Sequence, residues 1–137
     1  MEDCIFCKIT KGEIPCFKIY EDNDVLSFLD IKPFSKGHCL VIPKQHFENV
    51  FDISEDALQK VSVVAKKLSE KIKDVFSADG IRLSQSNGVA AGQEVMHFHL
   101  HIIPRYENDG LGTNPTATAH LPQADFEELK KVAEKLQ

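Results

Sequence analysis

Three histidines alternate with apolar residues in the segment HFHLHII, which covers His97–Ile103 of the 137-residue chain. Because side chains alternate between the two faces of a β-strand, a strand here would place the three imidazoles on one face. A neutral imidazole near pH 7 can act as a nucleophile or a hydrogen-bond donor, which suits attack on a phosphoryl group. Two other interpretations stay open from this segment alone: a polar sheet face in water, and the ligands of an open-site zinc hydrolase.

A cysteine pair near the N-terminus indicates a second kind of chemistry. Cys4 and Cys7 have the C-x-x-C spacing of half a closed zinc site, which needs two further ligands. His46 and one histidine of the alternating segment would complete it. Two cysteines near a terminus can also be small apolar residues, but structural disulfides are disfavoured in a cytosolic protein. The sequence therefore favours a metal site at this pair.

Length and composition favour one compact domain over residues 1–137. The chain is 42% hydrophobic and 27% charged, and its formal net charge of -5 disfavours binding to a nucleic acid polymer. No apolar run approaches the ~20 residues that a membrane-spanning helix needs. The first residues, MEDCIFCKIT, lack the basic start and apolar stretch of a secretory signal. We therefore expect a cytoplasmic protein without a membrane partner.

The periodicity predicts an α+β fold, in which an antiparallel sheet of about five strands packs with one long and one short helix. The long helix is expected over 53–76, with Asp52 and Glu55 as its N-terminal cap and Gly80 beyond its end. The short helix is expected over 125–136, and about twenty residues after Pro104 should be irregular. Strands are expected over 17–20, 24–30, 38–42, 81–86 and 97–103.

Four separated segments carry a family resemblance: IFCKITKGEIP, YEDNDVLSFLDIKP, GHCLVIPKQH and HFHLHII. In this order and spacing they resemble the histidine triad (HIT) family, over roughly residues 4–106. The similarity is greatest to its Hint-like branch, in a zinc-bearing bacterial-type version. The resemblance implies a HIT-like fold and a homodimer that joins its sheets. It leaves the C-terminal segment 107–137 outside the match.

The resemblance also implies roles for the histidines and cysteines. His99 would be the nucleophile that forms a nucleotidyl-histidine intermediate, which water then hydrolyses. His101 would contact the scissile phosphate and the leaving group, and His38 would support this network of rings. A closed, structural Zn²⁺ would be held by Cys4, Cys7, His46 and His97.

For the ligand, the resemblance implies that Asp30 accepts hydrogen bonds from the ribose hydroxyls and that Asn87 and Gln93 contact phosphate. Glu94 departs from the family pattern, because many Hint-like members carry Ser or Thr there. The C-terminal segment also does not match, so substrate specificity does not transfer. The base pocket would be lined by Ile5, Phe6, Ile9, Phe28, Leu29 and Ile31.

Together these features predict a hydrolase or nucleotidyl transferase that acts on purine nucleotides. It would cleave nucleoside 5′-phosphoramidates or adenylylated compounds to the nucleoside monophosphate. Two alternatives are a dinucleoside polyphosphate hydrolase and a nucleotide-binding regulatory module with little catalysis. A complete set of three histidines argues against the module, because binding alone needs no nucleophile.

Overall fold

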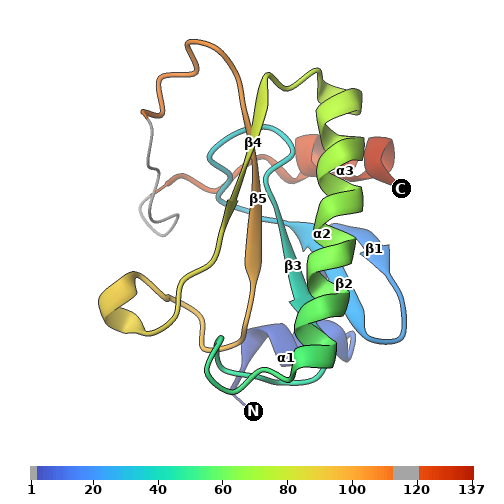
Figure 1. The fold of residues 1–137 in the computed structure, drawn as a ribbon. Coiled ribbons are helices and arrows are strands. Elements are labelled where there is room, and N and C mark those ends of the chain that lie inside the picture. The colour runs from blue at the N-terminus through green and yellow to red at the C-terminus, as the bar shows by residue number, and fades with distance from the viewer. Residues whose placement is uncertain (1–2, 113–120) are drawn as a thin grey trace.

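The structure is a computed structural model that describes residues 3–112 and 121–137. Its five strands form one antiparallel sheet in the order β1-β2-β3-β5-β4 (Figure 1), which confirms the predicted fold class. The strands are β1 (Lys18–Glu21), β2 (Val25–Leu29), β3 (Cys39–Pro43), β4 (Gly80–Ser84) and β5 (Leu100–Arg105). The helices are α1 (Ile5–Thr10), α2 (Glu55–Phe76) and α3 (Phe126–Leu136), with a 3₁₀ turn, η1, at Val89–Ala91.

The sheet carries a separate apolar cluster on each face, because successive side chains of a strand point in opposite directions. The larger cluster joins one face to α2 and α3, and α2 runs along the sheet in Figure 1. The smaller cluster lies beside α1 and contains Phe6, Leu26, Phe28, Leu40 and Ile42. The strands β2 and β3 are buried along their whole length, so they form a rigid base for residues at their ends.

The predicted long helix forms and ends at Phe76 as predicted, but its predicted N-terminal cap is wrong. Ser54 caps α2 through a hydrogen bond that its side chain accepts from the Ala57 N–H at 3.1 Å. Asp52 instead accepts the N–H of Asn49 and closes the preceding turn. The helix ends when Ser77 adopts a left-handed conformation with φ of 53°, and Gly80 begins β4. Ser and Asp are comparable N-caps, so composition alone does not separate them.

Strand β5 begins at Leu100, so the predicted strand over 97–103 is wrong for its first three residues. Before Leu100, the Phe98 N–H donates to the Phe47 carbonyl at 2.7 Å rather than to a ladder neighbour. The alternation of sides still persists, because Phe98 and Ile102 are buried in the larger cluster. Helix α1 was not predicted, since its six residues are too few to establish a helical repeat.

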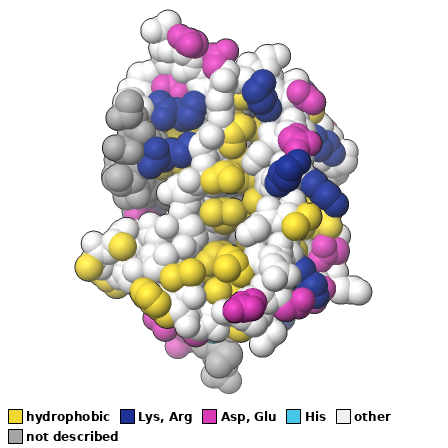
Figure 2. Space-filling view, in the orientation of Figure 1, with side chains coloured by type: hydrophobic (Ala, Val, Ile, Leu, Met, Phe, Trp, Pro, Cys, Tyr) yellow, Lys and Arg dark blue, Asp and Glu magenta, His cyan; other side chains and the backbone are white. Residues whose placement is uncertain are grey.

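The outer surface on the side of α2 mixes apolar and charged side chains. Figure 2 shows hydrophobic side chains in a stripe along the middle of the molecule, with charged groups on both sides. Strand β4 lies at one edge of the sheet, and its Leu83 is half exposed. In residues 3–112 and 121–137, no helix is long and apolar enough to cross a membrane. The predicted irregular segment after Pro104 lies partly outside the described residues.

Candidate active site

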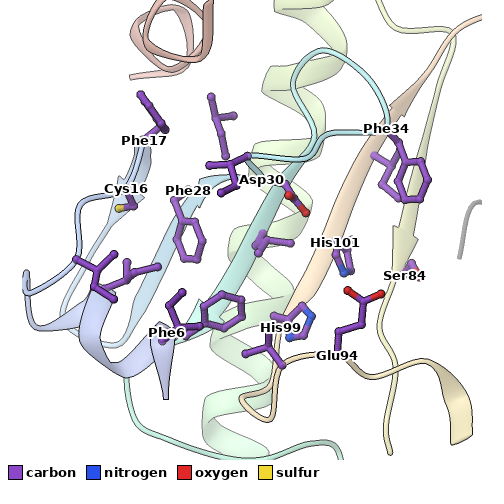
Figure 3. A pocket seen from close by; sticks show the side chains of 18 of the residues that line it. Phe6, Cys16, Phe17, Phe28, Asp30, Phe34, Ser84, Glu94, His99 and His101 are labelled. Carbon is purple, nitrogen blue, oxygen red and sulfur yellow. The ribbon is translucent and has the colours of Figure 1, made fainter. Parts of the chain in front are cut away.

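A cavity of about 560 Å³ opens on the α1 side of the sheet, which is within the size range of small-molecule sites. His99 and His101 lie in its wall, and Asp30 projects into it from the end of β2 (Figure 3). The structure therefore brings together segments that are about seventy residues apart in the chain. The cavity is also lined by the predicted base-pocket residues Ile5, Phe6, Ile9, Phe28, Leu29 and Ile31.

His99 is held as a neutral ring with one nitrogen free. Its Nδ1 lies 2.7 Å from the His97 carbonyl oxygen. Because a carbonyl can only accept, the proton must be on Nδ1, which leaves the lone pair on Nε2. Burial lowers the pKa of His99, against the opposite effects of the His97 carbonyl and of Glu94. A neutral imidazole with an unprotonated Nε2 is the state that a nucleophile requires.

His101 is held in the opposite tautomer through His38. The Phe34 backbone N–H donates to His38 Nδ1 at 3.0 Å, so the proton of the neutral His38 ring is on Nε2. That Nε2–H donates to His101 Nδ1 at 3.0 Å, which leaves the proton of His101 on its own Nε2. His38 itself does not line the cavity. The chain of bonds therefore presents an N–H donor from His101 beside the free nitrogen of His99.

Burial keeps this histidine pair neutral. It lowers the pKa of His38 to about 3, and burial together with His99 lowers that of His101 to about 4. Asp30 Oδ2 lies 3.7 Å from His38 Nε2. Since His38 is neutral, this contact is not an ion pair, and the shorter bond to His101 takes the His38 proton.

Replacing His38 with phenylalanine is expected to lower kcat/KM by about 10- to 100-fold, as is typical when a group that orients an active-site histidine is lost. Phenylalanine fills the buried site but has no N–H to donate to His101. The direct measurement is the ¹⁵N NMR spectrum of the His101 ring, which should change from a single tautomer to a mixture. His38→Gln, which keeps a donor, should lose less activity. An unchanged His101 spectrum in His38→Phe would contradict the arrangement.

Asp30 is a mostly buried carboxylate with one oxygen already engaged. Its Oδ1 accepts the Lys32 N–H at 2.8 Å. Burial, with a smaller contribution from Glu94, raises the pKa of Asp30 to about 6, against the lowering effects of Lys32. The remaining oxygen is an acceptor in the cavity wall. A carboxylate in this position suits a ligand that offers hydroxyl groups.

Asn87 and Gln93 do not line the cavity, although they were predicted to contact phosphate. Gln93 is buried, accepts the Gly88 N–H at 2.7 Å, and donates to two backbone carbonyls. Asn87 accepts the Val50 N–H at 2.7 Å and exchanges hydrogen bonds with Gln85. Both amides therefore hold the loop between β4 and β5, and their contact with phosphate stays a prediction.

The structure brings together all four predicted metal ligands. Cys4 Sγ lies 3.4 Å from His97 Nδ1, and Cys7 Sγ lies 3.5 Å from the same nitrogen and 3.3 Å from His46 Nδ1. The four ligand atoms all lie within 4.8 Å of one another. Adjacent ligands of a tetrahedral S/N zinc site are about 3.6 Å apart, so this spacing fits Zn²⁺.

The His97 ring is oriented for this metal site. Its Nε2 lies 2.8 Å from the Pro43 carbonyl oxygen, so Nε2 carries the proton and Nδ1 offers its lone pair toward the two sulfurs. A ligand histidine whose other nitrogen donates to a carbonyl is typical of zinc sites. Because the His97 backbone also fixes His99, the metal site and the cavity share one segment of chain.

A family model described as "HIT domain" matches residues 11–108 of this chain. The chain belongs to the HIT family. Adenosine 5′-monophosphoramidase HNT1 of Candida albicans is 43% identical over 138 residues, covering 97% of this chain and 88% of that protein. Adenylylsulfatase HINT3 of Arabidopsis thaliana is 38% identical over 131 residues, covering 96% of this chain and 66% of that protein.

A solved structure described as a Zn-bound histidine triad family protein, from Mycobacterium smegmatis, also matches this HIT protein. The two superpose with a TM-score of 0.81 at 33% identity, covering 98% of this chain and 96% of the other. This likeness extends beyond the residues that the family model matches. The family model ends at residue 108, whereas this structural alignment covers nearly the whole chain.

The HIT cavity contains residues that the sequence did not assign to a site. Phe126 of α3 lines it and contacts Phe17 edge to face, with ring centroids 5.3 Å apart. Ser84 and Ser86 line another part of the wall. No local signal identifies these residues, because each belongs to an ordinary strand, loop or helix until the sheet brings them together.

Proposed function

We propose that the protein hydrolyses purine nucleoside 5′-phosphoramidates or adenylylated compounds and releases the nucleoside monophosphate. The observation that carries this proposal is the neutral His99 ring, whose Nε2 is free while its Nδ1 is bound to the His97 carbonyl. The ring borders a largely apolar cavity that has room for a nucleotide. The names of the phosphoramidase and adenylylsulfatase relatives support the same chemistry.

In the first step, the lone pair of His99 Nε2 forms a bond to phosphorus. The bond from phosphorus to the leaving nitrogen breaks, and its electron pair stays on that nitrogen, which takes one proton from solvent. The His101 Nε2–H donates a hydrogen bond to the phosphoryl group or to the leaving atom, where charge develops. The intermediate is a nucleotidyl-histidine on His99.

In the second step, water attacks the same phosphorus atom. The bond between phosphorus and His99 Nε2 breaks, its electron pair returns to the ring, and the water releases one proton to solvent. The proton taken up in the first step is thereby balanced. The products are the nucleoside monophosphate and the free amine, and His99 regains its starting tautomer.

The nucleoside would occupy the apolar side of the cavity. Phe6 and Phe28 lie edge to face with centroids 5.5 Å apart and offer flat apolar surfaces for a purine base. Asp30 would accept hydrogen bonds from the ribose hydroxyls. Asn87 and Gln93 would hold the loop between β4 and β5 in place. For either amide to contact the phosphate directly, it would have to give up a present hydrogen-bond partner.

We also propose that Cys4, Cys7, His46 and His97 hold a structural Zn²⁺. A bound zinc ion supplies a closed cross-link between α1 and the segment before β5. A thiolate pair of this kind suits the reducing cytoplasm. The half-exposed Leu83 on edge strand β4 and the apolar stripe of Figure 2 favour a homodimer in which two sheets join.

The experiment that tests the proposed activity is hydrolysis of adenosine phosphoramidate, followed by chromatography of the adenosine monophosphate released. Turnover that exceeds the rate on a dinucleoside polyphosphate supports the proposal. Faster cleavage of the dinucleoside polyphosphate would favour that alternative instead. Tight nucleotide binding without turnover of either compound would identify a regulatory module.

The affinity for uncharged adenosine is expected to fall about tenfold between pH 7.5 and pH 5. The pKa of Asp30 is raised to about 6, so the carboxylate becomes protonated within this range and accepts ribose hydroxyls less well. His38 and His101 do not titrate there, since their pKa values lie near 3 and 4. Isothermal titration calorimetry at several pH values measures the change, and Asp30→Asn should remove it.

The stability of Asp30→Asn gives an independent control. Since the pKa is raised on folding, the folded protein binds this proton more tightly than the unfolded chain. The ionised carboxylate therefore lowers stability above pH 6, and this cost disappears as the pH falls toward 4. Asp30→Asn should raise Tm at pH 8 but not at pH 4. An equal change of Tm at both pH values would contradict the raised pKa.

A further inference from the structure

Glu94 places a carboxylate in the cavity beside the two active-site histidines. Figure 3 shows its side chain turned toward His99 and His101, with Ser84 beyond it. Phe6 and Phe28 lie on the other side of the His99 ring. Within residues 3–112 and 121–137, no hydrogen bond or ion pair engages this carboxylate. It therefore faces the ligand space without a partner of its own.

The rest of the cavity wall does not compensate this charge. Among the described residues that line it, Asp30 and Glu94 are acidic and none is Lys or Arg. His101 adds no positive charge to the wall near pH 7, because its Nδ1 already accepts the His38 N–H and burial lowers its pKa to about 4. The described part of the cavity wall therefore carries two acidic side chains and no basic one.

The two sides of the histidines would receive different parts of a substrate. If the nucleoside occupies the apolar side near Phe28, with its ribose at Asp30, the phosphoryl group lies at His99. The group attached to that phosphorus then extends toward Glu94 and Ser84. A negatively charged leaving group would be repelled by the Glu94 carboxylate there, and the described wall offers no Lys or Arg to pair with it. A leaving group with an ammonium group would instead be attracted to the carboxylate.

We propose that Glu94 selects the leaving group by charge, favouring phosphoramidates of amines that carry a second, cationic group and disfavouring anionic leaving groups. This inference rests on the proposed phosphoramidate hydrolysis. The ammonium group of such an amine pairs with Glu94 and offsets its repulsion of the phosphoryl oxygens. The bonds that form and break are those of the two steps above, and the ammonium group is unchanged by them.

The test compares adenosine phosphoramidates of three unbranched amines of similar length, which end in a methyl group, a carboxylate or an ammonium group. We expect kcat/KM of the wild type to be about tenfold higher for the ammonium-ended substrate than for the methyl-ended one. It should be about tenfold lower for the carboxylate-ended substrate. In Glu94→Gln both ratios should approach one, and added salt should reduce them in the wild type.

Ratios within one enzyme cancel any general loss of activity in the variant. Glu48→Gln is the matched control, since Glu48 is exposed and does not line the cavity; it should keep the wild-type ratios. If the wild type does not cleave the methyl-ended substrate, the proposed function fails. If it cleaves all three, and Glu94→Gln keeps the wild-type ratios, the charge selection is wrong while the proposed function stands. The charge selection would also be wrong if the kcat/KM ratios approached one in Glu48→Gln as well as in Glu94→Gln.

Discussion

Replacing His99 with alanine is expected to lower kcat for adenosine phosphoramidate by about 10⁴-fold or more, the loss typical of removing a nucleophile. His101 cannot substitute, because the His38 N–H occupies its Nδ1 and its Nε2 carries a proton. Intact-protein mass spectrometry of quenched reactions should detect a gain of one adenosine monophosphate in the wild type. The variant should show no such gain.

Two measurements separate loss of the nucleophile from loss of structure. The Tm and zinc content of His99→Ala should remain near those of the wild type, because the His99 side chain is not among the four clustered metal ligands. His99→Gly leaves room for added imidazole, which should restore part of the turnover. Retention of more than about a hundredth of wild-type kcat in a folded variant would exclude a covalent intermediate on this ring.

Replacing both Cys4 and Cys7 with alanine is expected to abolish binding of the proposed zinc ion and to lower the free energy of unfolding by about 3 kcal/mol or more. A zinc ion between Cys4 and His97 closes a loop of more than ninety residues, which constrains the unfolded chain as a long disulfide does. Native mass spectrometry should show one zinc per chain in the wild type and none in the variant. Chemical denaturation measures the loss of stability.

Cys16→Ala provides the matched control, because Cys16 lies in the cavity wall and outside the metal cluster. It should keep a full complement of zinc. A full complement in the double variant would instead contradict the structural assignment and favour the open-site hydrolase, in which the three alternating histidines bind the metal. That alternative also predicts that a chelator stops turnover at once, before the protein loses stability.

The sheet and its two faces were predictable because they depend on a repeat of two residues. The alternation from His97 to Ile103 assigns Phe98 and Ile102 to one face even though the first three residues are outside β5. The last residue of α2 was predicted, but the left-handed residue that caps the helix was not. Ser77 takes a left-handed conformation without being glycine, because the chain must turn there to enter β4.

The functional residues were predictable where several of them lie in one short sequence motif. They were less predictable where folding brings together residues that are distant in the chain. The Cys4–Cys7 pair was recognisable from its spacing and the resemblance to the HIT family implied His46 and His97, and the structure brings these four candidate ligands within 4.8 Å of one another. The tautomer of His101 depends on the Phe34 N–H, a backbone group that has no signature in the sequence. Gln93 illustrates the same limit of sequence reasoning, since its hydrogen bonds to Gly88 and to the Glu48 carbonyl depend on the folded loop, and its predicted contact with phosphate stays a prediction.

The bond from His99 Nδ1 goes to the backbone carbonyl of residue 97, whereas the proposed metal site uses the side chain of that residue. A carbonyl is present whatever amino acid occupies the position. In the course of evolution, therefore, a HIT protein can exchange its cysteines and His97 for other residues and still keep the reactive tautomer of His99, provided that packing replaces the cross-link. Within one family, the metal site can therefore be lost without a change in the reaction that His99 carries out.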